Sequence, residues 1–149
     1  MRVTLICTVL NEGEAMGALL DSVLAQSRPP DEVIIVDGGS RDGTVETLCS
    51  YQGRLPLRVL VEPGCNISRG RNAAIEASSG QVIASTDAGV RLSPNWLEAL
   101  LNPLEGEPGA AVACGFFLAD PRGAFETALG ATTLPDVEEI DPSRFLPSS

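Results

Sequence analysis

The sequence contains no histidine and no lysine, so all ten basic residues among its 149 are arginines. The absence of histidine excludes every mechanism that uses an imidazole as base or metal ligand, including Ser-His-Asp and Cys-His hydrolysis. Twenty acidic residues give a formal net charge of −10. Because nonspecific nucleic-acid binding requires a basic surface, we expect no nucleic-acid partner.

Cysteines are few, and none of their spacings forms the Cys-x-x-Cys pair of a structural zinc site. Cys7 and Cys114 lie within apolar runs typical of strands, which predicts that both are small core residues. No apolar run approaches the roughly 20 residues of a membrane span, so no transmembrane segment is expected. The N-terminus resembles a first strand rather than a signal peptide, so we expect a cytoplasmic protein, free or at the inner face of the membrane.

Apolar residues, which make up 44% of the chain, fall into alternating short runs and helical patterns. Five short apolar runs predict strands, at residues 3–10, 32–37, 57–61, 81–85 and 110–118. Three-four spacing and capping residues predict the helices between them, at residues 15–26, 44–50, 66–80 and from Ser93-Pro94 onward. This alternation predicts an α/β domain with a mostly parallel sheet and right-handed crossovers.

The alternation fades after Pro121, where residues 124–131 form one weak helical pattern. We therefore interpret residues 1–149 as a single domain that is truncated on its C-terminal side.

Three of the predicted strands end in polar groups. The first runs through Thr8 into Leu10, Asn11 and Glu12, and the others end in Asp37-Gly38-Gly39-Ser40 and Thr86-Asp87-Ala88-Gly89. Ligands of open parallel sheets bind beyond the carboxyl ends of the strands. We therefore expect these three endings to meet at one edge of the sheet and to form a binding site.

Asp37 has two interpretations. An aspartate at a strand end often caps its own turn, and the alternative is that its carboxylate accepts hydrogen bonds from a base or ribose. Gly38 and Gly39 would let a ligand approach the backbone closely. The spacing matches neither G-x-G-x-x-G nor the P-loop, so neither phosphate-binding motif applies.

Asp87 either caps its loop or ligates a divalent cation, Mg²⁺ or Mn²⁺, that bridges two phosphates. Arg69, Arg71 and Asn72 follow the predicted helix start at Asn66. Arginine in a first turn opposes the helix dipole, which favours an anion nearby, whereas a solvated helix face is the alternative for each arginine alone.

Taken together, four motifs resemble those of the family 2 glycosyltransferases. They are T-V-L-N-E at 8–12, V-D-G-G-S-R-D-G-T at 36–44, G-R-N at 70–72 and T-D-A-G at 86–89, with the helix pattern S-V-L-A-Q-S at 22–27. The resemblance covers residues 2–118. It implies a GT-A fold, which is a Rossmann-like α/β domain that binds a nucleotide-diphosphate sugar and a divalent cation and transfers the sugar with inversion.

The resemblance also implies roles for individual residues. Thr8, Leu10 and Glu12 would line the nucleotide site beside Asn11, and Asp37 would hydrogen-bond the base with Gly39 and Ser40 close by. Arg71 and Asn72, with Arg69, would lie near the nucleotide. Asp87, followed by Ala88, would match the first aspartate of the DXD motif and bind the metal.

The chain departs from the family pattern at two positions. Gly38 stands where a second carboxylate is usual, and Gly89 stands where the second DXD acid would help to hold the metal. The catalytic base of the family lies later in the chain, where Glu138, Glu139 and Asp141 are candidates only because they are late and acidic. The acceptor, a saccharide, lipid carrier or small molecule, is not specified by the sequence.

Two alternatives belong to other functional classes. A sugar-phosphate nucleotidyltransferase would carry a glycine-rich loop with arginine and lysine after the first strand, and here TVLNEGE stands there in a chain without lysine. A catalytically inactive nucleotide-binding or scaffold relative would keep the fold, and Gly89 favours that alternative.

Overall fold

A computed structural model describes residues 1–106, 109–121 and 123–133. The chain divides into two compact units, Met1–Ala99 and Leu100–Ser149. The first unit contains the whole β-sheet of the described residues.

The sheet has four strands: β1 (Val3–Val9), β2 (Glu32–Asp37), β3 (Leu57–Val61) and β4 (Val82–Ser85). Their order is β3-β2-β1-β4 and every pairing is parallel. The chain therefore moves outward from β1 through β2 to β3 and then returns to the other side of β1. This reversal makes the junction of β1 and β4 the topological switch point of the sheet.

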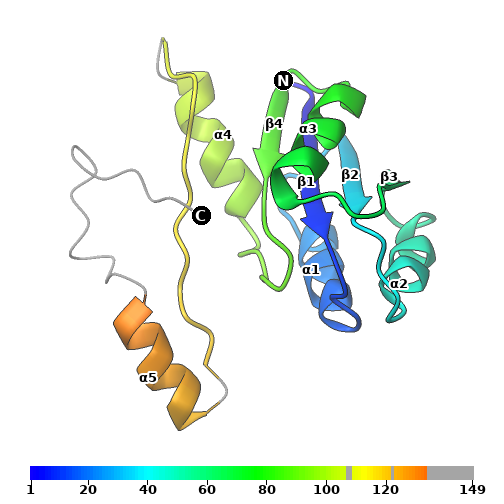
Figure 1. The fold of residues 1–149 in the computed structure, drawn as a ribbon. Coiled ribbons are helices and arrows are strands. Elements are labelled where there is room, and N and C mark those ends of the chain that lie inside the picture. Colours follow the sequence, from blue (N-terminus) through cyan, green and yellow to red (C-terminus); the bar gives the residue numbers. More distant parts are fainter. Residues whose placement is uncertain (107–108, 122, 134–149) are drawn as a thin grey trace. The chain divides into compact units, whose positions relative to one another are not determined.

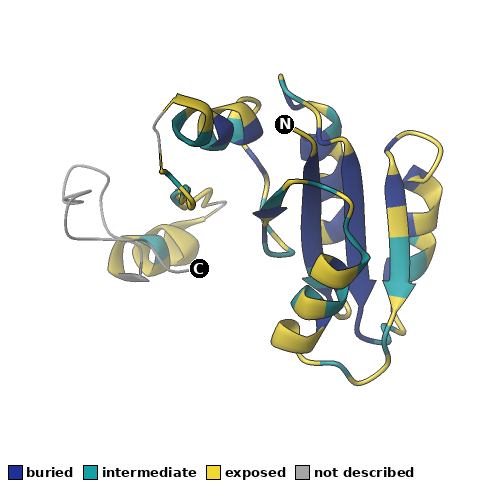
Figure 2. Ribbon diagram, turned by 90° about the horizontal axis from the view of Figure 1, so that it is seen from above, coloured by how far each residue is buried: buried dark blue, intermediate teal, exposed yellow. Residues whose placement is uncertain are grey.

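Helices cover both faces of the sheet (Figure 1). The helices α1 (Ala15–Leu24) and α2 (Thr44–Tyr51) contribute to one core cluster with alternate residues of β1, and α3 (Ile67–Ala77) packs on the opposite face. The central strands are consequently buried on both sides (Figure 2). All six residues of β2 are buried, as expected for a parallel strand of continuous apolar character.

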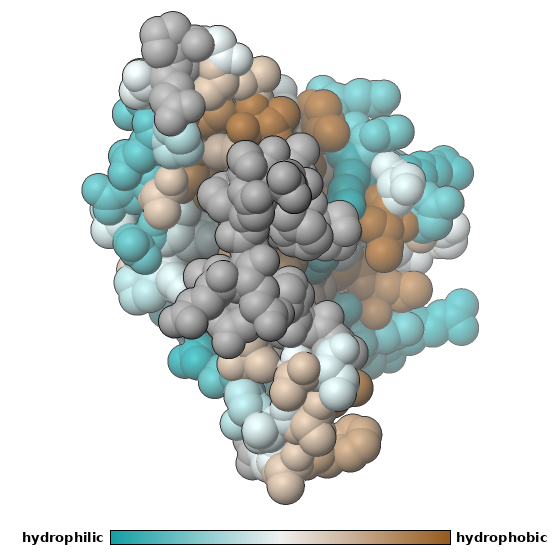
Figure 3. Space-filling view, turned by 90° about the vertical axis from the view of Figure 1, so that its left-hand side faces the viewer, coloured by the Kyte–Doolittle hydropathy of each residue, from teal (hydrophilic) through white to brown (hydrophobic). Residues whose placement is uncertain are grey.

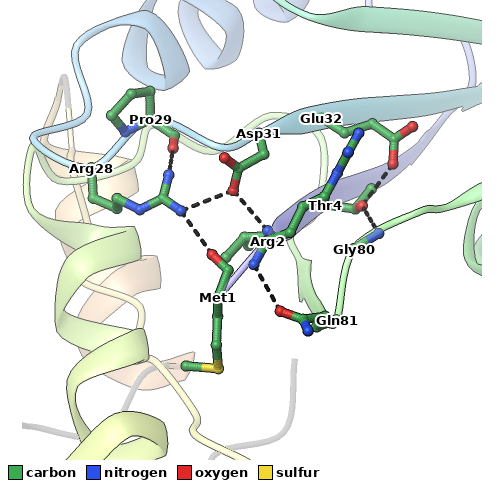
Figure 4. Close-up of polar contacts among 10 residues, drawn as sticks. Met1, Arg2, Thr4, Arg28, Pro29, Asp31, Glu32, Gly80 and Gln81 are labelled. Carbon is green, nitrogen blue, oxygen red and sulfur yellow. Dashed lines mark hydrogen bonds and ion pairs between the residues drawn. The ribbon is translucent and has the colours of Figure 1, made fainter.

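The amino edge of the sheet is closed by a polar network (Figure 4). Arg28 donates to Asp31 Oδ2 at 2.8 Å and to the Met1 carbonyl at 3.1 Å, and Asp31 Oδ2 also accepts from the Val3 backbone. The buried Glu32 carboxylate accepts from the Thr4 hydroxyl at 2.8 Å. These contacts tie the starts of β1 and β2 together.

The predicted strands at 32–37 and 57–61 are confirmed exactly, and the other elements of the first unit begin or end within a few residues of their predicted bounds. Small residues form the buried face of α3. Gly70 and Ala74 are buried, whereas Ile67 and Ile75 are exposed. Small residues allow the helix backbone to approach the sheet, so the bulky side chains on either side point outward.

The helix α4 (Trp96–Gly106) begins close to its predicted start and buries Leu97 and Leu101. The predicted strand at residues 110–118 is wrong, because this segment has no regular secondary structure. Cys114 is exposed rather than a core residue, whereas Cys7 is buried as predicted.

The second unit also contains α5 (Ala124–Thr133), close to the helical pattern predicted at 124–131. Several of its apolar side chains are exposed: Val112, Leu118, Phe125 and Leu129. The space-filling view shows brown hydrophobic surface between teal hydrophilic surface on the face that it presents (Figure 3). In the part of the chain that the structure describes, no helix has the length and apolar character needed to cross a membrane.

Candidate functional site

The polar strand endings predicted from the sequence meet at the carboxyl edge of the sheet. The register pairs Val9 with Asp37 and Asp37 with Val61, so β1, β2 and β3 end level with one another. On the other side of β1, the Thr86 backbone N–H donates to the Ile6 carbonyl at 3.1 Å. The loops after β1 and β4 therefore flank the switch point, where parallel α/β sheets bind their ligands.

The loop after β1 is held in place by the loop after β2. The Asn11 backbone, with φ of 56°, donates to Ser40 Oγ at 2.8 Å, and its side-chain oxygen accepts from the Arg41 backbone at 3.0 Å. Thr44 Oγ1 accepts from the backbone N–H groups of Glu12 at 3.0 Å and Gly13 at 2.9 Å. These four hydrogen bonds set the position of Glu12 at the edge.

Asp37 caps its own turn, which is one of the two interpretations of this residue. Its side chain is fully buried, and Oδ2 accepts from the backbones of Gly39 and Ser40, each at 2.9 Å. The Ser40 hydroxyl donates to Oδ1. Asp37 thus shapes the loop that bears Ser40, and its predicted contact with a base stays a prediction.

The two glycines after Asp37 differ in how strongly the backbone requires them. Gly39 has a φ of 99°, and an added Cβ would lie 3.2 Å from Pro63 Cα, so a side chain would be strained there. At Gly38, a Cβ would meet the Cys65 carbonyl oxygen at 3.4 Å and Leu10 Cδ1 at 3.5 Å, which is close to ordinary contact. The missing carboxylate at position 38 is therefore not imposed by the backbone.

On the other face of the sheet, α3 brings Arg71 to the loop after β4. Asn66 caps the helix, as predicted, by accepting from the Arg69 backbone at 2.9 Å. Arg71 Nη2 lies 2.5 Å from Asp87 Oδ1, with both side chains about one-third exposed, at 32% and 40%. The structure thus joins residues of two separate sequence motifs, and the contact orients the guanidinium at the switch point.

Thr8 and Gly70 are in very close contact beneath this pair. A Cβ at Gly70 would lie 2.4 Å from Thr8 Cγ2, so only glycine allows α3 to approach β1 this closely. Thr8 Oγ1 is buried and has no hydrogen-bond partner among the described residues. A buried hydroxyl without a partner is unusual, and at this edge it supports the prediction that a polar ligand binds nearby.

Most of the remaining predicted site residues are exposed to solvent. Arg69 is largely exposed and lies 3.7 Å from Glu62, and Asn72 is also exposed. Leu10 is 52% exposed beyond β1, and Ala88 packs against the core cluster on the α1 side. The three late acids proposed as catalytic bases, Glu138, Glu139 and Asp141, lie outside the described residues.

Two polar residues near the end of α1 hold residues 92–97, the segment that leads into α4, and neither has a role predicted from the sequence. The buried Ser22 hydroxyl accepts from the Leu92 backbone at 3.0 Å. The buried Gln26 side chain accepts from the Leu97 backbone at 3.0 Å and donates to the Ser93 carbonyl at 2.8 Å. Their spacing of four on the apolar face of a helical pattern is the sequence signal that could have identified them.

The cation ligands available at this edge are few. Among residues 1–106, 109–121 and 123–133, no group of three or more His, Cys, Asp or Glu side chains could hold a metal ion. Arg71 donates to Oδ1 of Asp87, and Oδ2 makes no hydrogen bond or ion pair with the residues that the structure describes. Because Mg²⁺ commonly uses one or two carboxylates together with phosphate oxygens, these residues fit a cation held largely by a bound diphosphate.

The charges at the edge act on the interior of β1. Burial, together with the nearby Asp87 and Glu12 carboxylates, raises the pKa of the Cys7 thiol to about 12, while Arg71 opposes them. The two carboxylates and the guanidinium therefore all act on the end of β1 from the same edge of the sheet.

A sequence model described as glycosyl transferase family 2 matches residues 4–141. The glycosyltransferase AglE of Haloferax volcanii is 34% identical over 108 residues, covering 70% of this chain and 36% of that protein. A validoxylamine A glucosyltransferase of Streptomyces hygroscopicus subsp. limoneus is 31% identical over 114 residues, covering 70% of this chain and 25% of that protein. The chain thus spans about a third or less of these relatives.

Two solved structures share the fold. The mannosyltransferase PcManGT of Pyrobaculum calidifontis, in complex with GDP-Man and Mn²⁺, has a TM-score of 0.71 and 27% identity over 80% of this chain and 36% of that one. S. aureus TarS 1-349, in complex with UDP-GlcNAc, has a TM-score of 0.62 and 25% identity over 66% of this chain and 30% of that one. The predicted GT-A type of α/β fold is confirmed.

Proposed function

This chain belongs to glycosyl transferase family 2, and from that premise we propose that its carboxyl edge binds the diphosphate of a nucleotide-sugar donor. The reaction served by this site is transfer of the sugar, with inversion at the anomeric carbon, to an acceptor hydroxyl. The observation that carries the proposal is the Arg71–Asp87 pair at the switch point, beside the unpartnered hydroxyl of Thr8.

Arg71 has the chemistry that a diphosphate leaving group requires. Negative charge develops on the leaving phosphate as the glycosidic bond breaks, and a fixed cation stabilises that charge. Asp87 orients the guanidinium through the 2.5 Å contact to Arg71 Nη2. The other N–H groups of Arg71 can then donate to phosphate oxygens. A bound Mg²⁺ or Mn²⁺, held by Asp87 and the phosphates, would add Lewis-acid stabilisation of the same charge.

The β1 side of the edge supplies polar groups for the nucleoside. We propose that Thr8, Asn11 and Ser40 contact the base or ribose and that Leu10 provides apolar surface against it. Thr8 Oγ1 has no partner among the described residues, and Leu10 is exposed directly beyond the strand. Asp37 contributes by holding Ser40 and, as predicted from the family resemblance, by contact with the base.

Calorimetric titration of the chain with UDP, GDP and their sugars, with and without Mn²⁺, tests this function. We expect one nucleotide to bind, more tightly with Mn²⁺ than without it, and the metal-dependent part to be lost in Asp87→Ala. A chain that binds neither nucleotide at millimolar concentration would not be a donor-binding domain. Release of pyrophosphate from a nucleoside triphosphate and a sugar phosphate would instead identify a nucleotidyltransferase.

A second candidate function is nucleotide binding without sugar transfer. The small number of cation ligands and the glycine at position 89 favour it. Donor binding without release of the nucleoside diphosphate, in the presence of a range of hydroxyl acceptors, would support this alternative over transfer.

A further inference from the structure

Position 89 marks a gap in the cation site on the proposed donor-binding edge. Gly89 has a φ of 75°, and it stands two residues after Asp87, on the loop that follows β4. A Cβ at this position would have a single neighbour within 4 Å, Oε2 of Glu12 at 3.8 Å. A carboxylate from another part of the chain therefore already lies beside the place where a side chain at position 89 would begin.

Glu12 reaches this place from the opposite side of the switch point. Glu12 follows β1, whereas Gly89 follows β4. These two neighbouring parallel strands form the switch point of the sheet. The Glu12 backbone is fixed by its hydrogen bond to Thr44 Oγ1 at 3.0 Å, between two residues of positive φ, Asn11 and Gly13. Its position is thus set by the fold.

The Glu12 carboxylate also lacks a partner of its own. The residue is half-buried, and within the described part of the chain its side chain makes no hydrogen bond or ion pair. Asp87, by contrast, is paired with Arg71. A half-buried carboxylate without a partner is unfavourable unless a cation or a donor compensates it.

We propose that Glu12 supplies the second protein carboxylate for the divalent cation, in place of the acid that position 89 lacks. The inference rests on the proposed donor-binding function and assigns the cation two protein ligands, Glu12 and Asp87, one from each side of the switch point. Oxygen ligands of this kind suit Mg²⁺ and Mn²⁺, with diphosphate and water completing the coordination. Glu12 is then a cation ligand rather than only a residue that lines the nucleotide site.

Exchange of the carboxylate between positions 12 and 89 tests this assignment. The binding of Mn²⁺ to the 149-residue chain is followed by the loss of the free-ion electron paramagnetic resonance signal, with UDP or GDP present, and nucleotide affinity is measured by calorimetry. We expect Glu12→Gln to weaken Mn²⁺ binding by roughly tenfold or more, a larger loss than in metal-free nucleotide binding. The matched control is Glu14→Gln, which removes an exposed carboxylate two residues away and should bind Mn²⁺ normally.

The double variant Glu12→Gln/Gly89→Asp should regain Mn²⁺ binding, because aspartate tolerates positive φ better than most residues and restores the carboxylate locally. The single variant Gly89→Asp shows by its melting temperature that the substitution permits folding. Unchanged Mn²⁺ binding in Glu12→Gln, or a loss that Gly89→Asp does not restore in a folded protein, would overturn the inference. Failure of the unsubstituted chain to bind either nucleotide would instead overturn the donor-binding function itself.

Discussion

Arg71 Nη2 lies 2.5 Å from Asp87 Oδ1, and this contact joins α3 to the loop after β4 at the switch point of the sheet. Each residue alone has an ordinary explanation, since arginines on helices are often solvated and aspartates at strand ends often cap loops. Their pairing makes a charged group of defined orientation at the edge where parallel sheets bind ligands.

Removal of the Arg71 guanidinium should weaken nucleotide binding without unfolding the protein. We expect Arg71→Ala to lower the affinity for UDP or GDP on the order of tenfold, because a charge-assisted contact to phosphate is lost. Arg71→Lys should recover part of the affinity, since it keeps the charge but not the forked geometry. Calorimetry measures the change, with Arg54→Ala, an exposed arginine after α2, as the control. Equal affinity in Arg71→Ala and the unsubstituted chain would remove Arg71 from the site.

Gly70 should be essential for the contact between α3 and β1. A Cβ there would lie 2.4 Å from Thr8 Cγ2, so Gly70→Ala should displace the helix and lower the free energy of unfolding by about 1–3 kcal/mol. The displacement should also move Arg71, which is the next residue. Urea denaturation measures the loss, and Gly53→Ala is the matched control because its Cβ would meet nothing within 4 Å. Similar stability of the two variants would show that α3 can shift at little cost.

The central strands and the helices that cover them could be predicted from the sequence, because their burial leaves a direct pattern. The strand at 32–37 is a continuous apolar run ending in an acid, and in the structure all six residues are buried. The apolar run at 110–118 has a similar composition but forms no strand. A strand requires a partner as well as apolar residues, and the sequence pattern contains no information on pairing.

The packing of α3 shows a second limit. Ile67 and Ile75 are exposed while the small residues Gly70 and Ala74 are buried. Hydrophobicity predicts which side chains prefer burial, but the close approach of two backbones depends on shape. The motif G-R-N at 70–72 indicated the position without indicating this reason for the glycine.

The candidate site was predicted as a set of residues, but not as a set of contacts. From the sequence, Asp37 could either cap its own turn or contact a ligand. The structure shows that its carboxylate oxygens accept hydrogen bonds from Gly39 and Ser40. The hydrogen bonds of Thr44 to the loop after β1 span more than thirty residues of sequence. Contacts at such separations depend on strand order, which the alternation of elements does not determine.

The Thr44 hydroxyl should determine the shape of the loop that bears Glu12. Thr44 is fully buried, accepts from the backbones of Glu12 and Gly13, and donates to Asp42 at 2.6 Å. Thr44→Val leaves partly buried N–H groups unpaired, so it should cost about 1–3 kcal/mol of unfolding free energy. Thr44→Ser keeps the hydroxyl and should lose much less. Denaturation of the two variants measures the difference, and a valine variant as stable as the serine variant would contradict this role.

Cys7 should be chemically inert in the folded protein. Burial, assisted by Asp87 and Glu12, raises the pKa of its thiol to about 12, and the thiolate is the reactive form. At mildly alkaline pH, iodoacetamide should therefore modify the exposed Cys49 and Cys114 but not Cys7. Peptide mapping by mass spectrometry measures each site, and the same reaction in urea is the control in which Cys7 should react. Native labelling of Cys7 at the rate of Cys49 would show that this end of β1 opens readily.

The Glu32 carboxylate should make the free energy of unfolding depend on pH in the acidic range. Burial by itself raises the pKa of Glu32, but hydrogen bonds from the Ser79 backbone and hydroxyl, from Thr4 and from Arg58 outweigh it and lower the pKa below its ordinary value of 4.5. Because the folded pKa is the lower one, the stabilisation is complete above the unfolded pKa and is lost as pH falls through the folded value.

Glu32→Gln should therefore destabilise the protein by about 1–3 kcal/mol near neutral pH, where a charge-assisted network is lost. The difference from the unsubstituted chain should shrink as the pH is lowered below the ordinary glutamate range, since Glu32 becomes protonated there. Thermal unfolding followed across this range measures both effects, with Glu46→Gln, an exposed glutamate of α2, as the control. A stability difference that stays constant down to strongly acidic pH would mean that the Glu32 contacts contribute through shape rather than charge.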